Sequence, residues 1–261
     1  MNCARTSDLP QALSDDAFLG GRLRLKQPVS GHHRAGHDAI LLAAATPACS
    51  GDHVVEFGAG VGVAGLALAR RVPGIALSMI EIDPALANLA AINAAANGIT
   101  AEVLRLDVGT DARAFAEAGL GPDSVDVVLM NPPFNHPVRQ NASPQAARRA
   151  AHVASETTLP TWVHAARRIL KPGGTLTLIW RADGLADVLG ELGRGFGGVS
   201  ILPIHGKASM PAIRVLVSAT KGGRAPLRLF EALLLNDAAG KPDSMAQAIL
   251  AGDASLPFAR R

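Results

Sequence analysis

Short apolar runs rich in β-branched residues alternate along most of this chain with longer stretches rich in alanine. The apolar runs suit buried strands and the alanine-rich stretches suit helices, so the alternation predicts βαβ units around a parallel sheet. Seven strands are expected, at 53–57, 75–82, 100–106, 125–130, 175–180, 199–204 and 212–220.

Proline and glycine mark the ends of the predicted helices. The stretch PALANLAAINAAANG carries Pro84 in its first turn and stops at Gly98, and LPTWVHAARRILKPGG stops at Pro172. Ahead of the first of these strands, FLGGRLRLKQP predicts a small hairpin that turns at Gly20 and Gly21, and HDAILLAAA predicts a helix.

Length and composition indicate a single large domain. The 261 residues are 48% hydrophobic, which is enough for a full core. We divide the chain into an N-terminal extension of hairpin and helix packed on the core (1–50), a main domain (51–236) and a C-terminal tail with weak patterns (237–261).

Charge and cysteine content give weak indications of the possible partners and of the cellular compartment. With 25 basic and 22 acidic residues the net charge is +3, which permits a polyanionic partner without requiring one. The two cysteines, Cys3 and Cys49, show no CxxC spacing, which favours a reducing cytoplasm over secretion. The N-terminus lacks the pattern of a signal peptide and no apolar run approaches transmembrane length, so we expect a cytoplasmic protein with no membrane partner.

The first chemical signal is VVEFGAGVG, a glycine-rich turn between a predicted strand and a predicted helix. Glycines there let the backbone approach a ligand closely. Gly60, Gly62 and Gly65 spell GxGxxG, the fingerprint of dinucleotide-binding folds. Glu56 and Gly58, continued by the glycines at 60 and 62, give the acidic-GxGxG form used for S-adenosylmethionine. Both registers fit.

Two acidic residues at the ends of the next strands suit either nucleotide. Glu81 could accept hydrogen bonds from both ribose hydroxyls, or it could be an ordinary exposed carboxylate. Asp107 could accept from an adenine amino group, although aspartate at a strand end is also a common turn former.

The stretch VVLMNPPFNHP runs from an apolar strand directly into a stiff polar loop. Pro132 and Pro133 have no backbone N–H, so the loop presents carbonyl acceptors, and Asn131 adds a side-chain carbonyl. A rigid pair of acceptors matches an amino group with two N–H donors, and Phe134 offers a face on which a planar group could stack. We therefore predict Asn131, Pro132, Pro133 and Phe134 as catalytic residues, a set for which a nicotinamide enzyme gives no reason.

These segments, together with IEID and LRLD, resemble the S-adenosylmethionine-dependent methyltransferases that modify exocyclic amino groups. The upstream run KQPVSGHHRAGHDAILLAAA is similar to a motif of the tRNA adenine-N6 methyltransferases that act beside the anticodon of valine tRNA. The matching residues are Gln27, Pro28, Gly31, Arg34, Asp38, Leu41 and Leu42. His33 and Ala35 replace the aromatic residues that this family carries around Arg34.

The resemblance implies an α/β fold, Rossmann-like, with the seven-stranded class I methyltransferase sheet and a short N-terminal extension. It implies S-adenosyl-L-methionine as the cofactor and RNA as the partner, with adenine N6 of a tRNA favoured as the acceptor. The implied cofactor-binding residues are Arg34, Asp38, Glu56, Gly58, Ala59, Gly60, Gly62, Glu81, Ile82, Asp107, Val108 and Asn131.

Four other functions stay open at this point. A ribosomal guanine-N2 methyltransferase also carries NPPF, although typically with a duplicated domain ahead of it. A glutamine-N5 methyltransferase of release factors usually shows NPPY and a helical N-terminal domain. An NAD-dependent oxidoreductase would use the same glycine loop, and a non-catalytic S-adenosylmethionine-binding protein is the fourth possibility.

Further polar and aromatic residues carry weaker signals. His33 and His37 are spaced like helical zinc ligands, but no third ligand of suitable spacing accompanies them, so no metal is expected. Trp162 and Trp180 are interpreted as core packing. Basic residues that could contact RNA phosphates are Arg139, Arg148, Arg149, Lys207, Arg214, Lys221, Arg224 and Arg228.

Overall fold

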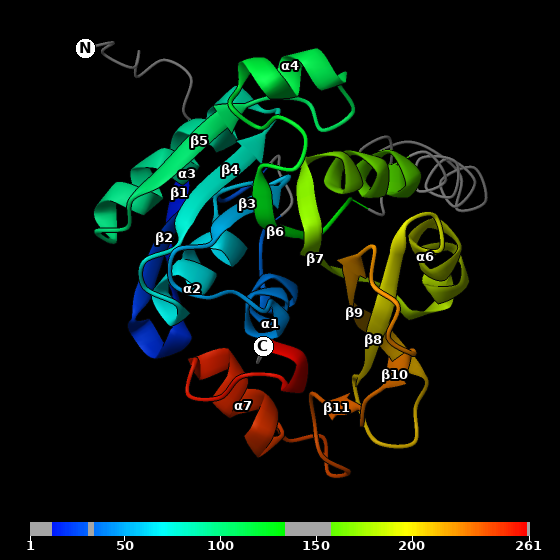
Figure 1. Cartoon of the computed structure of the whole chain (residues 1–261). Helices are drawn as coiled ribbons and strands as arrows, with labels where there is room; N and C mark the ends of the chain where they lie inside the picture. The colour runs from blue at the N-terminus through cyan, green and yellow to red at the C-terminus, as the bar shows by residue number, and fades with distance from the viewer. Residues whose placement is uncertain (1–11, 31–33, 134–157, 260–261) are drawn as a thin grey trace, which may run out of the picture.

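The computed structural model describes residues 12–30, 34–133 and 158–259, and a large mixed sheet runs through this part of the chain (Figure 1). Its strand order is β10-β8-β9-β7-β6-β3-β4-β5, and β11 also pairs with β8. Strand β9 runs antiparallel to β7 and β8, and the other neighbours are parallel. The strands are β3 His53–Phe57, β4 Ala76–Glu81, β5 Ala101–Arg105, β6 Val125–Met130, β7 Leu170–Arg181, β8 Phe196–His205, β9 Ala212–Lys221, β10 Arg228–Leu229 and β11 Leu233–Leu234.

The first seven of these strands are the seven that the apolar runs predict. The expected α/β fold with a seven-stranded sheet is therefore confirmed, and the structure adds the two-residue strands β10 and β11. The apolar pattern could not reveal these two, because they are too short to show any period.

Strand β7 begins earlier than the sequence predicts. The helix that covers 158–169 ends directly before Leu170, which already pairs with Val125. The next pair joins Thr175 to Val127, so the intervening KPGG forms a bulge. The expected helix end at Pro172 was therefore late, because a proline also disfavours helical backbone in the residues before it.

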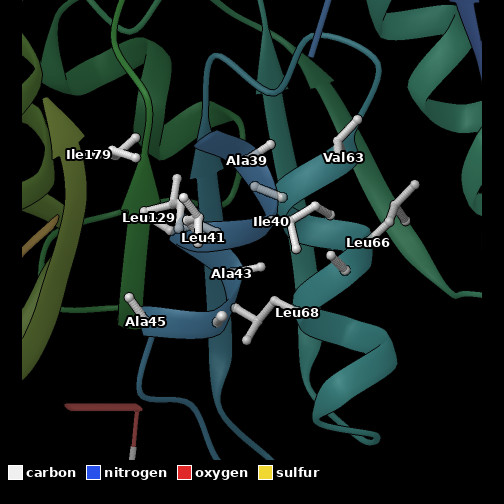
Figure 2. Close-up of a cluster of buried hydrophobic side chains, with 14 of the residues drawn as sticks. Ala39, Ile40, Leu41, Ala43, Ala45, Val63, Leu66, Leu68, Leu129 and Ile179 are labelled. Atoms are coloured by element: carbon white, nitrogen blue, oxygen red, sulfur yellow. The ribbon is translucent and has the colours of Figure 1, made fainter. Parts of the chain in front are cut away.

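Helices cover both faces of the sheet (Figure 1). Along β3, Val54 belongs to the core on one face and Val55 to the core on the other, as the period of a strand requires. Figure 2 shows part of the first core, where α1 and α2 meet Leu129 and Ile179 of the sheet. No helix in the described ranges is long and apolar enough to cross a membrane. The first face carries α1 His37–Ala45, α2 Val63–Arg71 and α3 Pro84–Ala96; the second carries α4 Ala112–Glu117, the 158–169 helix and, after the short η3 Ala182–Gly184, α6 Leu185–Leu192.

The residues at the two ends of helix α3 explain why its predicted bounds are correct. The Asp83 carboxylate accepts hydrogen bonds from the backbone N–H groups of Ala85 and Leu86 at 2.8 and 3.2 Å, and Pro84 occupies the first turn. Gly98 then adopts a left-handed φ of 62° just past the end of the helix.

The predicted N-terminal hairpin is present. Strands β1 Leu13–Phe18 and β2 Leu23–Pro28 pair antiparallel around the short turn η2 Leu19–Gly21. The turn includes Gly20 and Gly21, as the sequence predicts, and both have positive φ.

Asn93 of α3 and Asn97, the residue that caps the end of α3, attach β2 to the rest of the molecule. The Asn93 amide accepts from the Lys26 N–H at 2.8 Å and donates to the Lys26 carbonyl at 3.1 Å. Asn97 makes the same pair of bonds with Arg24, at 3.1 and 2.7 Å. Residues four apart lie on one face of a helix, so the two amides satisfy the edge of β2 as a neighbouring strand would.

The C-terminal residues return to α1. Helix α7 Ser244–Ala251 and the short η4 Pro257–Ala259 bury Ile249 and Phe258 in the first core. The Leu256 N–H donates to the Ala44 carbonyl at 3.1 Å. The sequence indicated only a weakly patterned tail here. Its few apolar residues form part of a core only when they pack against α1, and this contact cannot be read from the local pattern.

Replacing Asn93 with alanine should lower the free energy of unfolding by about 1–3 kcal/mol, because the backbone N–H and carbonyl of Lys26 lose the buried amide that pairs with both. Asn88→Ala on the same helix is the matched control, since none of the described hydrogen bonds involves its side chain. It should change the value by less than about 0.5 kcal/mol. Guanidinium unfolding followed by circular dichroism measures both, and equal losses would contradict the proposed attachment.

Candidate functional site

A cavity of about 560 Å³ opens where β3, β4, β5 and β6 end. The carboxyl ends of strands are where open α/β sheets bind ligands, and the volume suits a small molecule. Gly62 does not line the cavity, and Phe134 lies outside the described residues. The predicted residues that do line it are Arg34, Asp38, Glu56, Gly58, Ala59, Gly60, Glu81, Ile82, Asp107, Val108, Asn131, Pro132 and Pro133.

The glycine loop between β3 and α2 borders this cavity in a conformation that requires glycine. Gly58 and Gly60 have φ values of 63° and 58°. A Cβ on Gly58 would lie 2.4 Å from Cη2 of Trp162, whereas a Cβ on Gly60 would meet nothing within 4 Å. The backbone at Gly60 therefore faces open space. Gly62 instead directly precedes α2 with a left-handed φ of 90°, and a Cβ there would lie 3.0 Å from the Met79 sulfur. Gly62 therefore shapes the turn into the helix and does not face the cavity.

Glu81 holds the glycine loop in place. Its Oε2 accepts from the Gly60 N–H at 2.7 Å and its Oε1 from the Asp83 N–H at 2.9 Å. The residue is 7% exposed, so it is not the ordinary exposed carboxylate that the sequence left open. Each carboxylate oxygen has a second lone pair, which leaves acceptor sites for a ligand.

Glu56 lies beneath the same loop and is buried. Its Oε2 accepts from the Gly65 N–H at 2.8 Å. Burial raises the pKa of Glu56 to about 8, opposed by the hydrogen bond from Gly65 and assisted by the charge of Glu81. At neutral pH the Glu56 carboxyl group is therefore mainly protonated, which avoids a second buried negative charge beside Glu81.

Asp107 forms the turn that the sequence allowed, and its contact with a cofactor stays a prediction. Its Oδ1 accepts from the Gly109 N–H at 2.7 Å, which stabilises the turn after β5, and the residue also lines the cavity. Ile82 and Val108 add apolar surface to the cavity.

Asn131 follows β6 directly and lines the cavity. Its carboxamide oxygen is buried, and no donor among the described residues reaches it. Buried acceptors in folded proteins are nearly always hydrogen-bonded, so this oxygen is prepared for a donor that the described chain does not supply.

The N-terminal extension forms one wall of the cavity. The buried Gln27 amide accepts from the Ala35 N–H at 2.9 Å and donates to the Ala35 carbonyl at 3.3 Å. It also donates to Asp16 at 2.7 Å, and Asp16 pairs with Arg34. The hairpin thus positions Arg34 and the residues that follow it at the cavity.

Several basic residues that the sequence offered as RNA contacts have partners within the fold. Arg214 pairs with Asp38 at 2.9 Å, Lys221 pairs with Asp123 at 2.7 Å, and Arg228 donates to a serine of β8 at 3.0 Å. RNA contacts by these residues stay a prediction. Lys207 and Arg224 are exposed, and Arg139, Arg148 and Arg149 lie outside the described residues.

Core packing, which the sequence suggested for Trp162, describes only part of its position. The sequence suggested core packing for both tryptophans; Trp180 is indeed buried, but Trp162 is only half-buried and lines the cavity. Its ring also stands edge-on to Phe57, with centroids 6.2 Å apart. No local signal distinguishes the two tryptophans, because the difference depends on where the 158–169 helix lies against the glycine loop.

His37 also lines the cavity, while His33 lies outside the described residues. Within the described ranges, no three His, Cys, Asp or Glu residues gather closely enough to hold a metal ion.

Comparison with known proteins connects this geometry to a family. Residues 26–207 match the Methyltransferase small domain family. The chain belongs to this family. It is 30% identical to the tRNA1(Val) (adenine(37)-N6)-methyltransferase of Dickeya chrysanthemi over 217 residues, which cover 81% of this chain and 83% of that protein. It is 31% identical to ribosomal RNA small subunit methyltransferase C of Pseudomonas aeruginosa over 58% of this chain, but it spans only 39% of that protein.

Solved structures agree with this assignment. A predicted O-methyltransferase from Agrobacterium tumefaciens is 29% identical with a TM-score of 0.70, over 84% of this chain and 98% of that one. The 16S rRNA N2 G1207 methyltransferase of Thermus thermophilus, solved with AdoMet and guanosine, shares the fold at 20% identity and a TM-score of 0.52, over 80% of this chain and 50% of that one.

As a member of this family, the protein takes S-adenosylmethionine as its cofactor, and the nicotinamide reading is wrong. The cavity fits that cofactor on its own evidence. The carboxylates of Glu81 and Asp107 suit hydroxyl and amino donors, and the open space at Gly60 lets a ligand approach the backbone.

Replacing Glu56 with glutamine should change how stability depends on pH. The ordinary pKa of 4.5 is raised to about 8 by folding, so between these values the unfolded chain releases a proton that the folded protein retains. The free energy of unfolding of the natural protein should therefore fall as the pH rises through this window, by at most about 1.4 kcal/mol per pH unit.

The Glu56→Gln variant should lack this decline, whereas Glu117→Gln, which alters an exposed carboxylate of α4, should keep it. Guanidinium unfolding without cofactor at pH values from 5 to 8 measures the three slopes. A Glu56→Gln slope equal to that of the natural protein would show that Glu56 ionises normally.

Proposed function

We propose that this methyltransferase transfers a methyl group from S-adenosylmethionine to the N6 amino group of an adenine in tRNA near the anticodon, in the cytoplasm. The observation that carries the proposal is the buried carboxamide oxygen of Asn131, which lines the cavity and lacks a donor among the described residues. An amino group of a base would supply that donor.

The proposed cofactor contacts follow from the acceptors in the cavity. Glu81 would accept from the ribose hydroxyls through the lone pairs that its two backbone partners leave open. Asp107 would accept from the adenine amino group of the cofactor, and Gly60 would allow close approach. When bound, S-adenosylmethionine supplies a methyl group activated by its sulfonium charge. Further proposed contacts are Arg34, Asp38, Gly58, Ala59, Ile82 and Val108.

The Asn131 and Pro132 carbonyl groups would orient the acceptor. The lone pair of a base amino nitrogen is delocalised into the ring, and hydrogen bonds from its two N–H groups to these oxygens favour a pyramidal nitrogen with a free lone pair. Orientation then supplies most of the rate, and no strong base is needed. Glu56 supports the loop and is mainly protonated at neutral pH, so we assign it no part in proton removal. The nitrogen loses its proton to water after transfer.

The extent of the similarity supports the tRNA branch. The match to the Dickeya chrysanthemi tRNA methyltransferase covers 81% of this chain, whereas the match to the Pseudomonas aeruginosa ribosomal RNA enzyme covers 58%. A base must leave its stack to reach such a cavity, which costs a few kcal/mol in a helix and less in a loop. An adenine in an anticodon loop meets this requirement.

Mass spectrometry of nucleosides from total tRNA and from ribosomal RNA of a deletion strain tests the substrate. N6-methyladenosine should disappear from tRNA and return when the natural gene is supplied. Loss of N2-methylguanosine from ribosomal RNA, of a 2′-O-methyl nucleoside, or of N5-methylglutamine in release factors would replace the proposed acceptor with another.

Replacing Asn131 with alanine should lower the rate of methyl transfer at least about 100-fold, because an oriented acceptor is lost, as removing one oxyanion-hole donor does elsewhere. Cofactor affinity, measured by calorimetry, should change less than about 3-fold, because the cofactor keeps its proposed contacts with Glu81, Asp107 and Gly60.

Gly60→Val is the opposite control. Its side chain would extend into the open space at Gly60 and should weaken cofactor binding at least about 10-fold. Collapse of cofactor affinity in Asn131→Ala would instead make the NPPF segment structural and contradict the assignment.

A further inference from the structure

A second cavity, of about 450 Å³, lies beside the first. It is bordered by the loop after β5, by the 158–169 helix and by the end of α6. Val108 lines both cavities, and the same helix directs Trp162 to the first and His164 to the second. The two cavities are therefore neighbours on one helix.

The second cavity is strongly basic. Arg167, Arg168 and Arg194 line it together with His164, and the only acidic residue among the described lining residues is Glu191. Three guanidinium groups against the Glu191 carboxylate, with the Asp111 carboxylate near Arg168, still leave an excess of positive charge that favours an anion.

Arg168 carries a buried donor without a partner. Its guanidinium lies over the Phe115 ring at 4.7 Å, and its Nη2 reaches the Thr110 and Asp111 carbonyls only at 3.4 and 3.5 Å. Its Nε is buried and has no acceptor among the described residues. The Arg168 guanidinium therefore keeps donor capacity for a group with several oxygen acceptors.

The neighbouring side chains add donors. Arg167 donates to the Arg194 carbonyl and, at 3.3 Å, to Nδ1 of His164. A guanidinium cannot accept, so Nδ1 is the acceptor and the hydrogen of a neutral imidazole sits on Nε2, where it is available to donate. Arg194 is 74% exposed and meets Glu191 only at 3.6 Å, so its charge is weakly engaged.

We propose that this basic cavity binds phosphate groups of the RNA strand on either side of the target nucleotide while the target base occupies the first cavity. The inference rests on the proposed function for the choice of RNA. Phosphate is favoured over carboxylate because arginine forks match its oxygens and because a nucleotide whose base enters the first cavity brings its own backbone phosphates to this helix.

The test compares the Arg167→Gln/Arg194→Gln double variant with Arg24→Gln/Arg70→Gln. The control pair removes two exposed charges from β2 and α2, on the opposite face of the sheet. Fluorescence anisotropy measures binding of a labelled tRNA1(Val) anticodon stem-loop over a range of salt concentrations. Calorimetry of S-adenosylmethionine binding and thermal unfolding check that each variant is intact.

The cavity variant should bind the stem-loop about 10-fold more weakly, and the slope of log affinity against log salt should fall by about 1.5, as expected for two lost phosphate contacts. The control pair should stay within about 2-fold of the natural protein, since Arg24 and Arg70 lie far from the cavity. Arg168→Lys keeps the charge but removes the Nε donor, and should weaken binding about 3-fold.

Equal losses in both double variants, an unchanged cavity variant, or a natural protein that binds no stem-loop would each overturn the proposal. So would polyglutamate that binds as tightly as the stem-loop and depends on Arg167 and Arg194, because it would assign the cavity to acidic protein chains. Failure of the proposed function can be distinguished from failure of this inference. If tRNA keeps N6-methyladenosine in the deletion strain while the slope changes as expected, the acceptor is wrong and the phosphate site stands.

Discussion

The site depends on one attachment, that of the glycine loop to the end of β4, where the Ala59 N–H donates to the Ile80 carbonyl and the Gly60 N–H donates to the Glu81 carboxylate. A loop rich in glycine has many conformations available, and a fixed backbone there must be imposed from outside. Strand pairing makes this possible, because β3 and β4 run parallel with Phe57 opposite Ile80, which brings Glu81 beside the loop. A second carboxyl group, that of Glu56, attaches the start of α2 from below. The two groups can lie so close because Glu56 retains its proton at neutral pH.

Side-chain amides fix the N-terminal extension to the core by hydrogen bonds, as the carboxyl groups fix the glycine loop. Asn93 bonds both to the β2 backbone and, at 3.0 Å, to the Val61 carbonyl of the glycine loop. Gln27, at the end of the same strand, pairs with the backbone of Ala35. Amides both donate and accept, so they can replace a missing strand without adding charge. The hairpin, the glycine loop and the cavity wall consequently form one connected structure.

The 158–169 helix separates two kinds of chemistry. On one side, Trp162 and the Asn131 oxygen border the cavity in which the proposed transfer to an amino group would take place. On the other side, arginines gather in a cavity suited to a polyanion. Under the proposed function this separation keeps Arg167, Arg168 and Arg194 away from the acceptor nitrogen, which would become positively charged as the methyl group arrives.

The sequence by itself determined the features that local patterns encode. The seven strands are visible as apolar runs because strands buried on both faces need them, and Pro84 and Gly98 mark the two ends of α3. The glycine loop and Asn131 stand at strand ends, so their convergence follows from a parallel sheet.

Only the tertiary structure decided which residues meet across long separations. It placed Trp162 at the cavity and Gly62 away from it, ordered the C-terminal helix against α1, and joined Asn93 to Lys26. It also gathered Arg167, Arg168 and Arg194 around one cavity, although the late basic residues that the sequence favoured include Arg214, which pairs with Asp38. Such contacts depend on how helices pack on the sheet, and packing is set by the whole core and leaves no period or spacing in the sequence.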